Sequence, residues 1–393
     1  MPHNTNAPRS RAAILGLSLL AATELTACGS GSSASSSNSG GGTGGTGSSG
    51  NPSIVVINQE AADLVWDPVN QVIYLSVPST AGTNANTISV LNPLTGDITK
   101  SVSIGNDPDV LALSAGSQYL YVGLDGSSLV QRLILPDLTP DVSYSLGGDP
   151  VFGPYIALDL QVAPGDPHTT AVTSGTSSGP FGGITIYDDA TPRPTMATGT
   201  TGYYDSLQWG SDDTALYAAN TVGSGGFYAL AVNTSGVTLS NTYPNILPED
   251  DGWAMNIHYD AGIQLIYDDN GSVVDPNTGK LVGSFTASPT SQQGVMVPDS
   301  SLNAAFFLYQ TSVPYQLTIE SFDINKFTSI AQSQVNPVGG TPLRVIRWGT
   351  NGLAFNTYSI EGTNQVFVVR GSIVANDVNA TSNRSGHSEP QAH

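Results

Sequence analysis

Leu111-Ala112-Leu113-Ser114 and, after a three-residue turn, Gln118-Tyr119-Leu120-Tyr121-Val122-Gly123 form the stretch that decides the fold. The second run is rich in residues that favour β-strands, and the turn before it contains Gly116. Further runs of this kind stand at residues 72–76, 215–219, 264–267, 305–309 and 365–369. After Ala22 no helical spacing of apolar residues is sustained, and 44 Gly and 25 Pro interrupt the chain often. The sequence therefore predicts an all-β protein.

The pair of strands around a polar turn repeats along the chain. The turns begin at Asp67, Ser114, Pro164, Ser211, Asp260, Asp299 and Thr350, so the intervals are 47, 50, 47, 49, 39 and 51 residues. A period of roughly 40–50 residues that carries several strands is typical of a β-propeller. The seven turns predict seven blades.

The seventh repeat is short by one strand. Its C-terminal part offers three strands, at residues 343–348, 352–357 and 365–370, while residues 53–58 form a strand-like run before the first blade. Pairing this N-terminal run with the last blade would close the ring and leave no exposed sheet edge. We therefore predict a seven-bladed β-propeller over residues 51–375, closed by an N-terminal strand.

Part of the repeat resembles a known bacterial family. Residues 104–108, 111–114 and 118–123, together with the run from Asn86 to Gly96, are similar to the repeat of YVTN-type (YncE-like) propellers. The resemblance is sharp over residues 60–147 and loose elsewhere, notably over residues 155–201. It implies the propeller fold and little chemistry, because such propellers serve as binding modules, surface-layer proteins and several enzymes.

The N-terminus reads as a lipoprotein signal. Arg9 and Arg11 precede an apolar stretch from residue 12 to 22, which has signal-peptide length and is too short to span a bilayer. Leu25-Thr26-Ala27-Cys28 resembles the bacterial lipobox, and Cys28 is the only cysteine. We expect residues 1–28 to be the signal segment with Cys28 lipidated; the alternative is a free thiol at an ordinary cleavage site. Gly29 is not the aspartate associated with inner-membrane retention, which favours the outer membrane of a bacterial envelope.

Both flanks of the predicted propeller are polar. Residues 29–50 are almost entirely Gly, Ser and Thr, which predicts a flexible linker with a reach of about 25 Å. Residues 376–393 read as a disordered tail. Removal of Glu24, Arg9 and Arg11 with the signal leaves 30 acidic and 9 basic residues, a net charge near −21. This charge argues against nucleic acid and anionic lipid as direct partners, and we expect a monomer tethered to the membrane by its anchor.

Catalytic and metal-binding motifs are absent from the sequence. The histidines inside the propeller, His168 and His258, fall in different blades, so we expect neither a metal nor a cofactor. Acidic pairs invite a calcium hypothesis, but most fall in turns, where aspartate caps its own backbone. These pairs are Asp188-Asp189, Asp212-Asp213, Glu249-Asp250-Asp251 and Asp268-Asp269.

The links between blades supply the candidate ligand-binding residues. Such links lie at one end of a propeller, at the mouth of its channel, and here they are acidic and aromatic with one basic residue. The candidates are Asp109, Tyr204, Asp205, Asp251, Trp253 and Arg344. Aromatic and carboxylate groups suit sugars, peptides or cations. The alternatives are that a propeller rim is polar in any case, and that Arg344 pairs with Asp109 or Asp205 to relieve repulsion.

Two classes of function remain open. The first is a membrane-tethered binding or scaffold module for a protein or glycan, favoured by the anchor, the linker and the lack of catalytic motifs. The second is a propeller enzyme, such as a lactonase-like hydrolase or a quinoprotein-like oxidoreductase, with its site at the channel mouth. Convergence of Arg344 and two rim carboxylates within about 6 Å would favour the enzyme.

Overall fold

The strands follow the predicted pattern through the whole ring. The computed structural model describes residues 53–177, 181–198, 204–220, 226–247, 256–286, 291–312, 315–335, 340–359, 364–371, 373 and 374. The predicted signal segment, linker and tail therefore lie outside the described residues, as do Cys28, Asp251 and Trp253. No helix among the described residues has the length and apolar character that crossing a bilayer requires.

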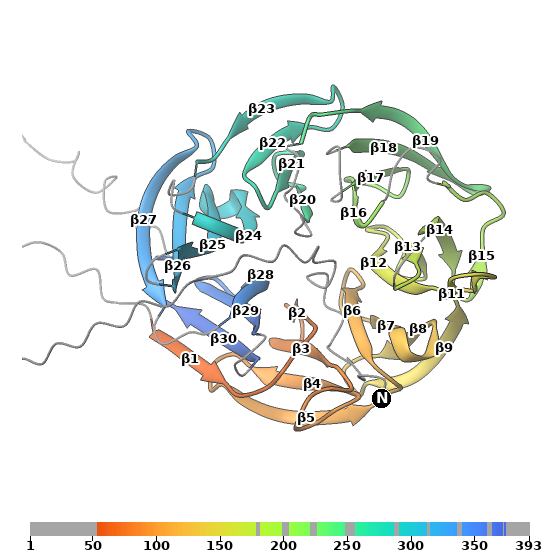
Figure 1. Ribbon diagram of the computed structural model, residues 1–393, viewed down its shortest axis with the longest axis horizontal. Coiled ribbons are helices and arrows are strands. Elements are labelled where there is room, and N and C mark those ends of the chain that lie inside the picture. The colour runs from red at the N-terminus through yellow and green to blue at the C-terminus, as the bar shows by residue number, and fades with distance from the viewer. Residues whose placement is uncertain are drawn as a thin grey trace, which may run out of the picture.

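Seven four-stranded antiparallel sheets surround one axis, with β2, β6, β12, β16, β20, β24 and β28 innermost (Figure 1). Blade 1 is β2 (Asp63–Asp67), β3 (Val72–Val77), β4 (Thr87–Asn92) and β5 (Asp97–Ser103). Blade 2 is β6 (Pro108–Leu113), β7 (Tyr119–Leu124), β8 (Leu129–Ile134) and β9 (Thr139–Ser145). Blade 3 is β12 (Ile156–Val162), β13 (Thr169–Gly175), β14 (Phe181–Asp188) and the short β15 (Thr191–Pro192).

The remaining blades keep the same order. Blade 4 is β16 (Ser206–Trp209), β17 (Ala215–Ala219), β18 (Phe227–Asn233) and β19 (Gly236–Tyr243). Blade 5 is β20 (Ile257–Asp260), β21 (Leu265–Asp268), β22 (Ser272–Asp275) and β23 (Lys280–Ser284). Blade 6 is β24 (Ser291–Asp299), β25 (Ala304–Ser312), β26 (Tyr315–Asp323) and β27 (Thr328–Val335). Two one-turn helices, η2 (Asp125–Ser127) and η3 (Ser300–Leu302), and the hairpin β10–β11 (Gly148–Asp149, Gly153–Pro154) complete the assigned elements.

Blade 7 is completed by the N-terminal strand, as the sequence predicts. It contains β28 (Thr341–Trp348), β29 (Gly352–Tyr358) and β30 (Gln365–Arg370), and β1 (Ser53–Ile57) forms its outer edge. The strands β1 and β30 are antiparallel, with Val55 opposite Val368. The beginning and the end of the described chain thus share one sheet, at the meeting of the red and blue ends of the colour scale in Figure 1.

The core is divided among the junctions between blades. Within the described residues, each of the seven junctions holds one cluster of buried apolar side chains drawn from both neighbours. At the closing junction, Trp348 and Val368 of blade 7 pack with Leu64 and Leu75 of blade 1. Leu64 and Leu75 are fully buried, and burial of such a side chain contributes about 1.5–3 kcal/mol. The ring is therefore held together blade against blade rather than by a single central core.

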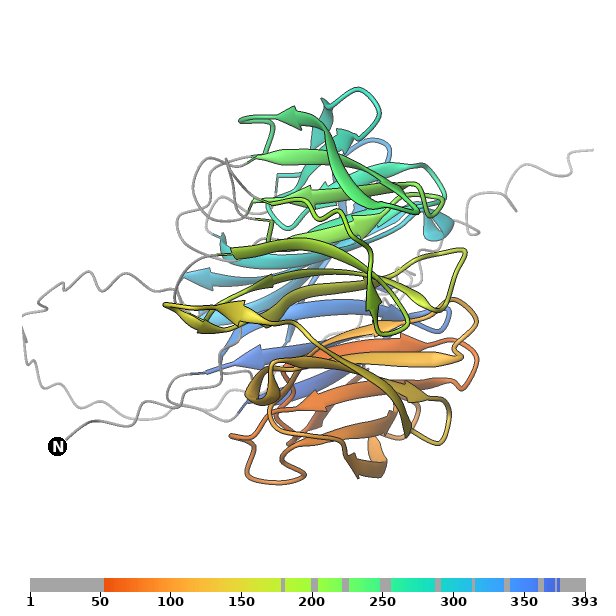
Figure 2. The ribbon, with the colours of Figure 1, turned by 90° about the vertical axis from the view of Figure 1, so that its right-hand side faces the viewer.

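The two ends of the ring differ in their connections. In an antiparallel blade, the first and third strands begin at one end, which we call the mouth end, and the second and fourth strands finish there. The links between blades and the loops from second to third strands lie at the mouth end, and the tight turns lie at the opposite turn end. Figure 2 shows the ring from the side, with the strands running across its thickness.

Candidate functional site

A hollow at the mouth end lies where the ring closes. It encloses about 400 Å³, including the part that is open to solvent. Its walls come from blade 7, from the link into blade 1 and from the start of blade 2, so we call it the seam pocket. The seam pocket is lined by Glu60, Ala61, Ala62, Pro78, Asp107, Pro108, Asp109, Asp125, Leu343, Thr357, Tyr358 and Asn364.

Neighbouring polar groups hold two of the four acidic side chains of the pocket. Asp107 adopts a left-handed backbone conformation, with φ of 57°, and its N–H donates to Asn86 Oδ1 at 2.8 Å. Its Oδ1 accepts from the N–H and the hydroxyl of Ser79, at 2.9 and 2.8 Å. The Thr80 hydroxyl donates to Glu60 Oε1 at 2.9 Å. These bonds fix one oxygen of each of these two carboxylates at the edge of the pocket.

Of the predicted rim residues, Asp109 lines the seam pocket and Arg344 stands beside it. Asp109 is the second residue of β6, as the link position predicts. Arg344 donates from Nη1 to Asp63 Oδ2 at 3.1 Å, across the junction between blades 7 and 1. Asp63 is only 3% exposed and also accepts the N–H of Leu111 in blade 2 at 2.9 Å. Arg344 thus pairs with a buried carboxylate that was not among the candidate partners, which were Asp109 and Asp205.

Tyr204 does not present its ring to the mouth. Its side chain is 2% exposed and meets Tyr228 edge to face, with ring centroids 4.8 Å apart. It belongs to the apolar cluster between blades 3 and 4. The tyrosine therefore packs in the core between these two blades rather than at the mouth. Asp205 follows it and is partly exposed, with its N–H donating to the carbonyl of Ala219 at 3.2 Å.

The prediction from the sequence did not include several residues of the pocket. Glu60, Asp125 and Asn364 were outside the candidate set, as were Thr357 and Tyr358 of β29. Asp125 and Asn364 lie in loops between second and third strands. An antiparallel blade returns every second connection to the same end, so strand counting alone would have placed these loops at the mouth. Which loop side chains converge depends on the closure of the ring, and no single repeat contains that information.

A second polar group lies at the mouth end of blade 5. Asp269 Oδ1 accepts the N–H of Met296 at 2.9 Å and lies 2.8 Å from His258 Nε2. Its Oδ2 accepts the N–H and Nδ2 of Asn256, both at 2.9 Å. Burial raises the pKa of the adjacent Asp268 carboxyl to about 7. The contact between His258 and Asp269 therefore links the first strand of blade 5 to the loop that follows its second strand.

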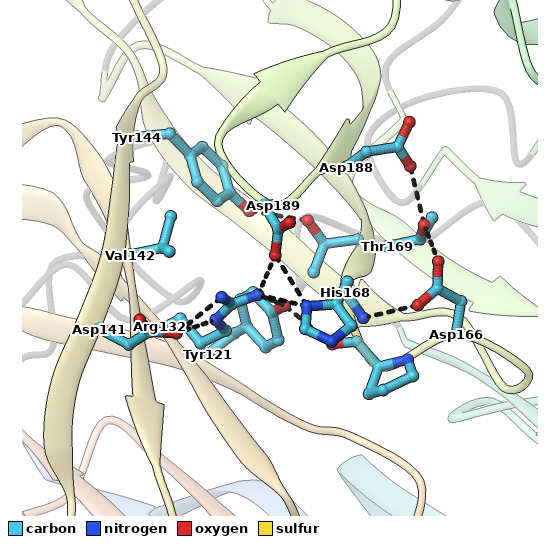
Figure 3. A network of polar contacts seen from close by, with 12 residues as sticks. Tyr121, Arg132, Asp141, Val142, Tyr144, Asp166, His168, Thr169, Asp188 and Asp189 are labelled. Carbon is cyan, nitrogen blue, oxygen red and sulfur yellow. Dashed lines mark hydrogen bonds and ion pairs between the residues drawn. The ribbon is translucent and has the colours of Figure 1, made fainter.

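The other histidine of the propeller belongs to a network at the turn end, between blades 2 and 3 (Figure 3). Arg132 is 5% exposed, donates from Nε to Asp141 at 2.8 Å and also pairs with Asp189. His168 Nδ1 lies 2.8 Å from Asp189 Oδ1. The guanidinium carbon of Arg132 lies 4.5 Å from the ring centroid of Tyr119.

This network has the properties of an inter-blade clamp. The hydrogen bond from Arg132 lowers the pKa of Asp189, so the carboxylate stays charged opposite the guanidinium. The neighbouring Asp188 accepts two hydrogen bonds from Arg193, at 2.8 and 2.9 Å, and one from Thr169 at 2.8 Å. Asp188 and Asp189 therefore form ion pairs with basic side chains, Asp188 with Arg193 and Asp189 with Arg132. Among the described residues, no group of three or more His, Cys, Asp and Glu is arranged to hold a metal ion.

Comparisons with known proteins agree with this architecture. No protein-family model and no curated protein matches the sequence. The β-propeller domain of Cps50 (Swd1) from Myceliophteria thermophila is similar, at 10% identity, a TM-score of 0.56 and coverage of 80% of this chain and 98% of that one. U3-55K has 10% identity and a TM-score of 0.56, and the match covers 81% of this chain and 98% of U3-55K. The WD40 repeats of RRP9 have 11% identity and a TM-score of 0.56, and cover 81% and 97%. Identities this low show the fold alone, which is a seven-bladed, WD40-like β-propeller.

Proposed function

We propose that this chain is a binding or scaffold module that takes a protein or glycan ligand at its mouth end. The observation that carries the proposal is the seam pocket, a hollow at the closure of the ring whose lining combines four acidic residues with Tyr358. Ligand pockets combine concave shape with a few placed polar groups and an apolar or aromatic wall. Arg344, the basic residue that an enzyme site would use, donates from Nη1 to the buried Asp63 rather than to an acidic residue of the pocket lining.

A hairpin at the same end of the ring supports a macromolecular ligand. The hairpin β10–β11 joins blade 2 to blade 3, and its tip carries Val151 and Phe152, which are 81% and 54% exposed. Asp149 holds the tip in place by accepting the N–H groups of both residues, at 2.7 and 2.9 Å. Large apolar side chains in a fixed, exposed turn fit a contact surface for a protein.

The proposal also places the module outside the cytoplasm. The lipobox-like sequence before Cys28 and the Gly/Ser-rich residues 29–50 fit a bacterial, YVTN-type lipoprotein tethered in the outer membrane of the envelope. Cys28→Ser should release the protein from the membrane fraction and leave the melting temperature of the propeller unchanged, because the propeller begins after the linker. Membrane fractionation and phase partitioning test this expectation. A Cys28→Ser protein that is fully processed and still partitions with detergent would contradict the tether.

Binding at the mouth end is tested by comparing two variants that each remove one negative charge. Asp109→Asn changes the seam pocket, and Asp137→Asn changes an exposed residue in a strand-connecting turn at the opposite end of the ring. Purified full-length chain would be used on glycan arrays and as bait for envelope proteins, with quantification against the wild type. Ligands lost with Asp109→Asn and kept with Asp137→Asn would support the proposal. Ligands that respond equally to both changes would refute it.

A further inference from the structure

We propose that the turn end beside the closing junction rests on the bilayer that carries the lipid anchor, so that the mouth end faces away from the membrane. This inference deepens the proposed function and rests on its tether. The contact surface consists of Val69, Leu94 and Arg370, which we call the tether patch. Three observations carry the inference, which are the place where the chain enters the ring, the apolar side chains exposed there, and an arginine without an acidic partner.

The chain enters the ring at its turn end. Ser53, the first residue of β1, stands opposite Arg370, the last residue of β30, and a third strand finishes at the turn end. The turn between β4 and β5 packs closely on this entry point, because a Cβ on Gly96 would come within 2.6 Å of Val55 Cγ1. The predicted linker of residues 29–50 reaches about 25 Å, so it holds this end of the ring close to the lipid.

Two exposed apolar side chains lie at the turn end of blade 1, the blade next to the entry point. Leu94, in the turn between β4 and β5, is 63% exposed, and Val69, in the turn between β2 and β3, is 62% exposed. The Leu94 N–H donates to Asn92 Oδ1 at 2.9 Å. The Val69 N–H donates to Asp67 Oδ1 at 2.9 Å. Apolar side chains on ordered turns can enter the headgroup region with little further loss of conformational entropy.

Arg370 supplies the positive charge of the tether patch. Its Nη2 donates to the carbonyl of Leu94 at 2.7 Å, and its guanidinium carbon lies 5.9 Å from a ring centroid of Trp348. None of the ion pairs formed between described residues includes Arg370. A surface guanidinium without a carboxylate partner suits a lipid phosphate, which it binds through two parallel hydrogen bonds.

The charges at the two ends of the ring favour the same orientation. At the turn end, the exposed Asp97 follows Leu94 in the same turn, so apolar contact has to supply most of the attraction. At the mouth end, four acidic residues line the seam pocket, and the adjacent Arg344 already pairs with Asp63. An anionic bilayer therefore repels the mouth end more strongly than the tether patch. Because the anchor keeps the ring near the lipid, a weak contact is sufficient to orient it.

The experiment follows two labelled positions in the full-length, lipidated protein, reconstituted at low salt in vesicles of phosphatidylethanolamine with a minority of phosphatidylglycerol. A lipidated Cys28 has no free thiol, so one introduced cysteine is the single point of labelling. Leu94→Cys places a nitrobenzoxadiazole fluorophore at the turn end, and Val151→Cys places it on the exposed hairpin tip at the mouth end. Quenching by spin-labelled lipid measures contact with the bilayer, and flotation with the vesicles measures the tether.

Two further changes in the Leu94→Cys protein test the other residues of the tether patch. These changes are Val69→Ser and Arg370→Gln. The matched control is Lys326→Gln, because Lys326 is an exposed base at the turn end of blade 6 and pairs with Asp323. Melting temperatures establish that each variant is folded.

We expect spin-labelled lipid to quench the fluorophore at Leu94→Cys and to leave the one at Val151→Cys bright. Val69→Ser should lower the ratio of docked to free protein about tenfold, because an aliphatic side chain is lost from the contact with the bilayer. Arg370→Gln should lower this ratio about fivefold, because each basic residue near an anionic surface adds attraction of that size. Lys326→Gln should leave the ratio unchanged.

Several results would overturn the inference. Equal quenching at both positions, or quenching at Val151→Cys alone, would show that the ring has no fixed orientation or docks by its mouth end. Absence of quenching at both positions in a protein that floats with the vesicles would refute the docking and keep the tether. An unchanged ratio in both Val69→Ser and Arg370→Gln would exclude the tether patch as the contact. A protein that does not float and has a free thiol at Cys28 would refute the tether together with the inference.

Discussion

At the scale of single residues, short polar side chains in the first strands join neighbouring blades. Asp63 accepts the N–H of Leu111 at 2.9 Å, and Asp159 accepts the N–H of Leu207 at 2.7 Å, in both cases 48 residues further along. Ser206 performs the same task for the N–H of Ile257 at 3.1 Å. The first strand is the inner edge of its sheet, so backbone N–H groups that point toward the axis have no neighbouring strand to bond. A side chain from the preceding blade accepts one of these N–H groups instead.

Asp63 combines this role with the ion pair to Arg344, so replacing its carboxylate should destabilise the protein. Asp63→Asn should lower the free energy of unfolding by about 1–3 kcal/mol, because the partly exposed guanidinium of Arg344 loses its counter-charge and the buried acceptor of the Leu111 N–H weakens. Urea denaturation measures the loss. The exposed Asp97→Asn is the control and should change stability little. A double-mutant cycle with Arg344→Gln should give a coupling energy clearly above zero; additive effects would contradict the ion pair.

Asp268 should make the stability of the propeller depend on pH. Burial raises the pKa of its carboxyl from 3.8 to about 7. A carboxyl with a raised folded-state pKa contributes stability that is complete below about pH 4 and is lost as the pH rises through about 7. Asp268→Asn keeps a neutral side chain at every pH. The wild type should therefore lose on the order of 3 kcal/mol against this variant between pH 4 and pH 8. If the free energy of unfolding of the two proteins followed parallel pH profiles, burial would not raise the pKa of Asp268.

At the scale of elements, β1 is the strand on which the whole ring depends. It contributes the outer edge of blade 7, and Ile57 enters the core cluster between blades 7 and 1. Deletion of residues 51–59 should lower the melting temperature by many degrees and promote aggregation, because it exposes the edge of β30. Deletion of residues 29–50 is the control, since it leaves every described strand in place. Equal melting temperatures for the two deletions would contradict closure by β1.

The blades could be predicted from the sequence because each repeat carries its own strands and turn. The predicted turns that begin at residues 67, 114 and 299 all lie where the first strand of a blade ends and the chain turns toward the second. The residues of the site were less predictable, because their side chains depend on contacts between repeats. Tyr204 stands at a rim position in sequence, yet packs on Tyr228. The burial of Asp63 as an acceptor for the next blade likewise requires knowledge of which strands are neighbours.

At the scale of the whole molecule, the seam pocket forms only when the ring closes, because its lining comes from both sides of the closing junction. Residues 60–62 lie three to five residues after the end of β1, and Thr357 and Tyr358 end β29 in the same sheet. Asn356 of β29 donates from Nδ2 to the carbonyls of Ala61 and Ala62, at 2.8 and 3.1 Å, which fixes the link against blade 7. An open ring would have the same blades and would lack the pocket.

The register of β1 against β30 therefore gives the most direct test of ring closure by the N-terminal strand. Cysteines at Val55 and Val368, placed in a Cys28→Ser background, stand directly opposite each other, where antiparallel strands bring Cα atoms to about 4.5–5.5 Å, within the range of a disulfide. Under oxidation this pair should cross-link quantitatively without loss of secondary structure, as measured by mass spectrometry of the folded protein. The pair Val55→Cys and Val369→Cys is one residue out of register, with its side chains on opposite faces, and should not cross-link. Equal cross-linking of both pairs, or of neither, would contradict a ring closed by its N-terminal strand.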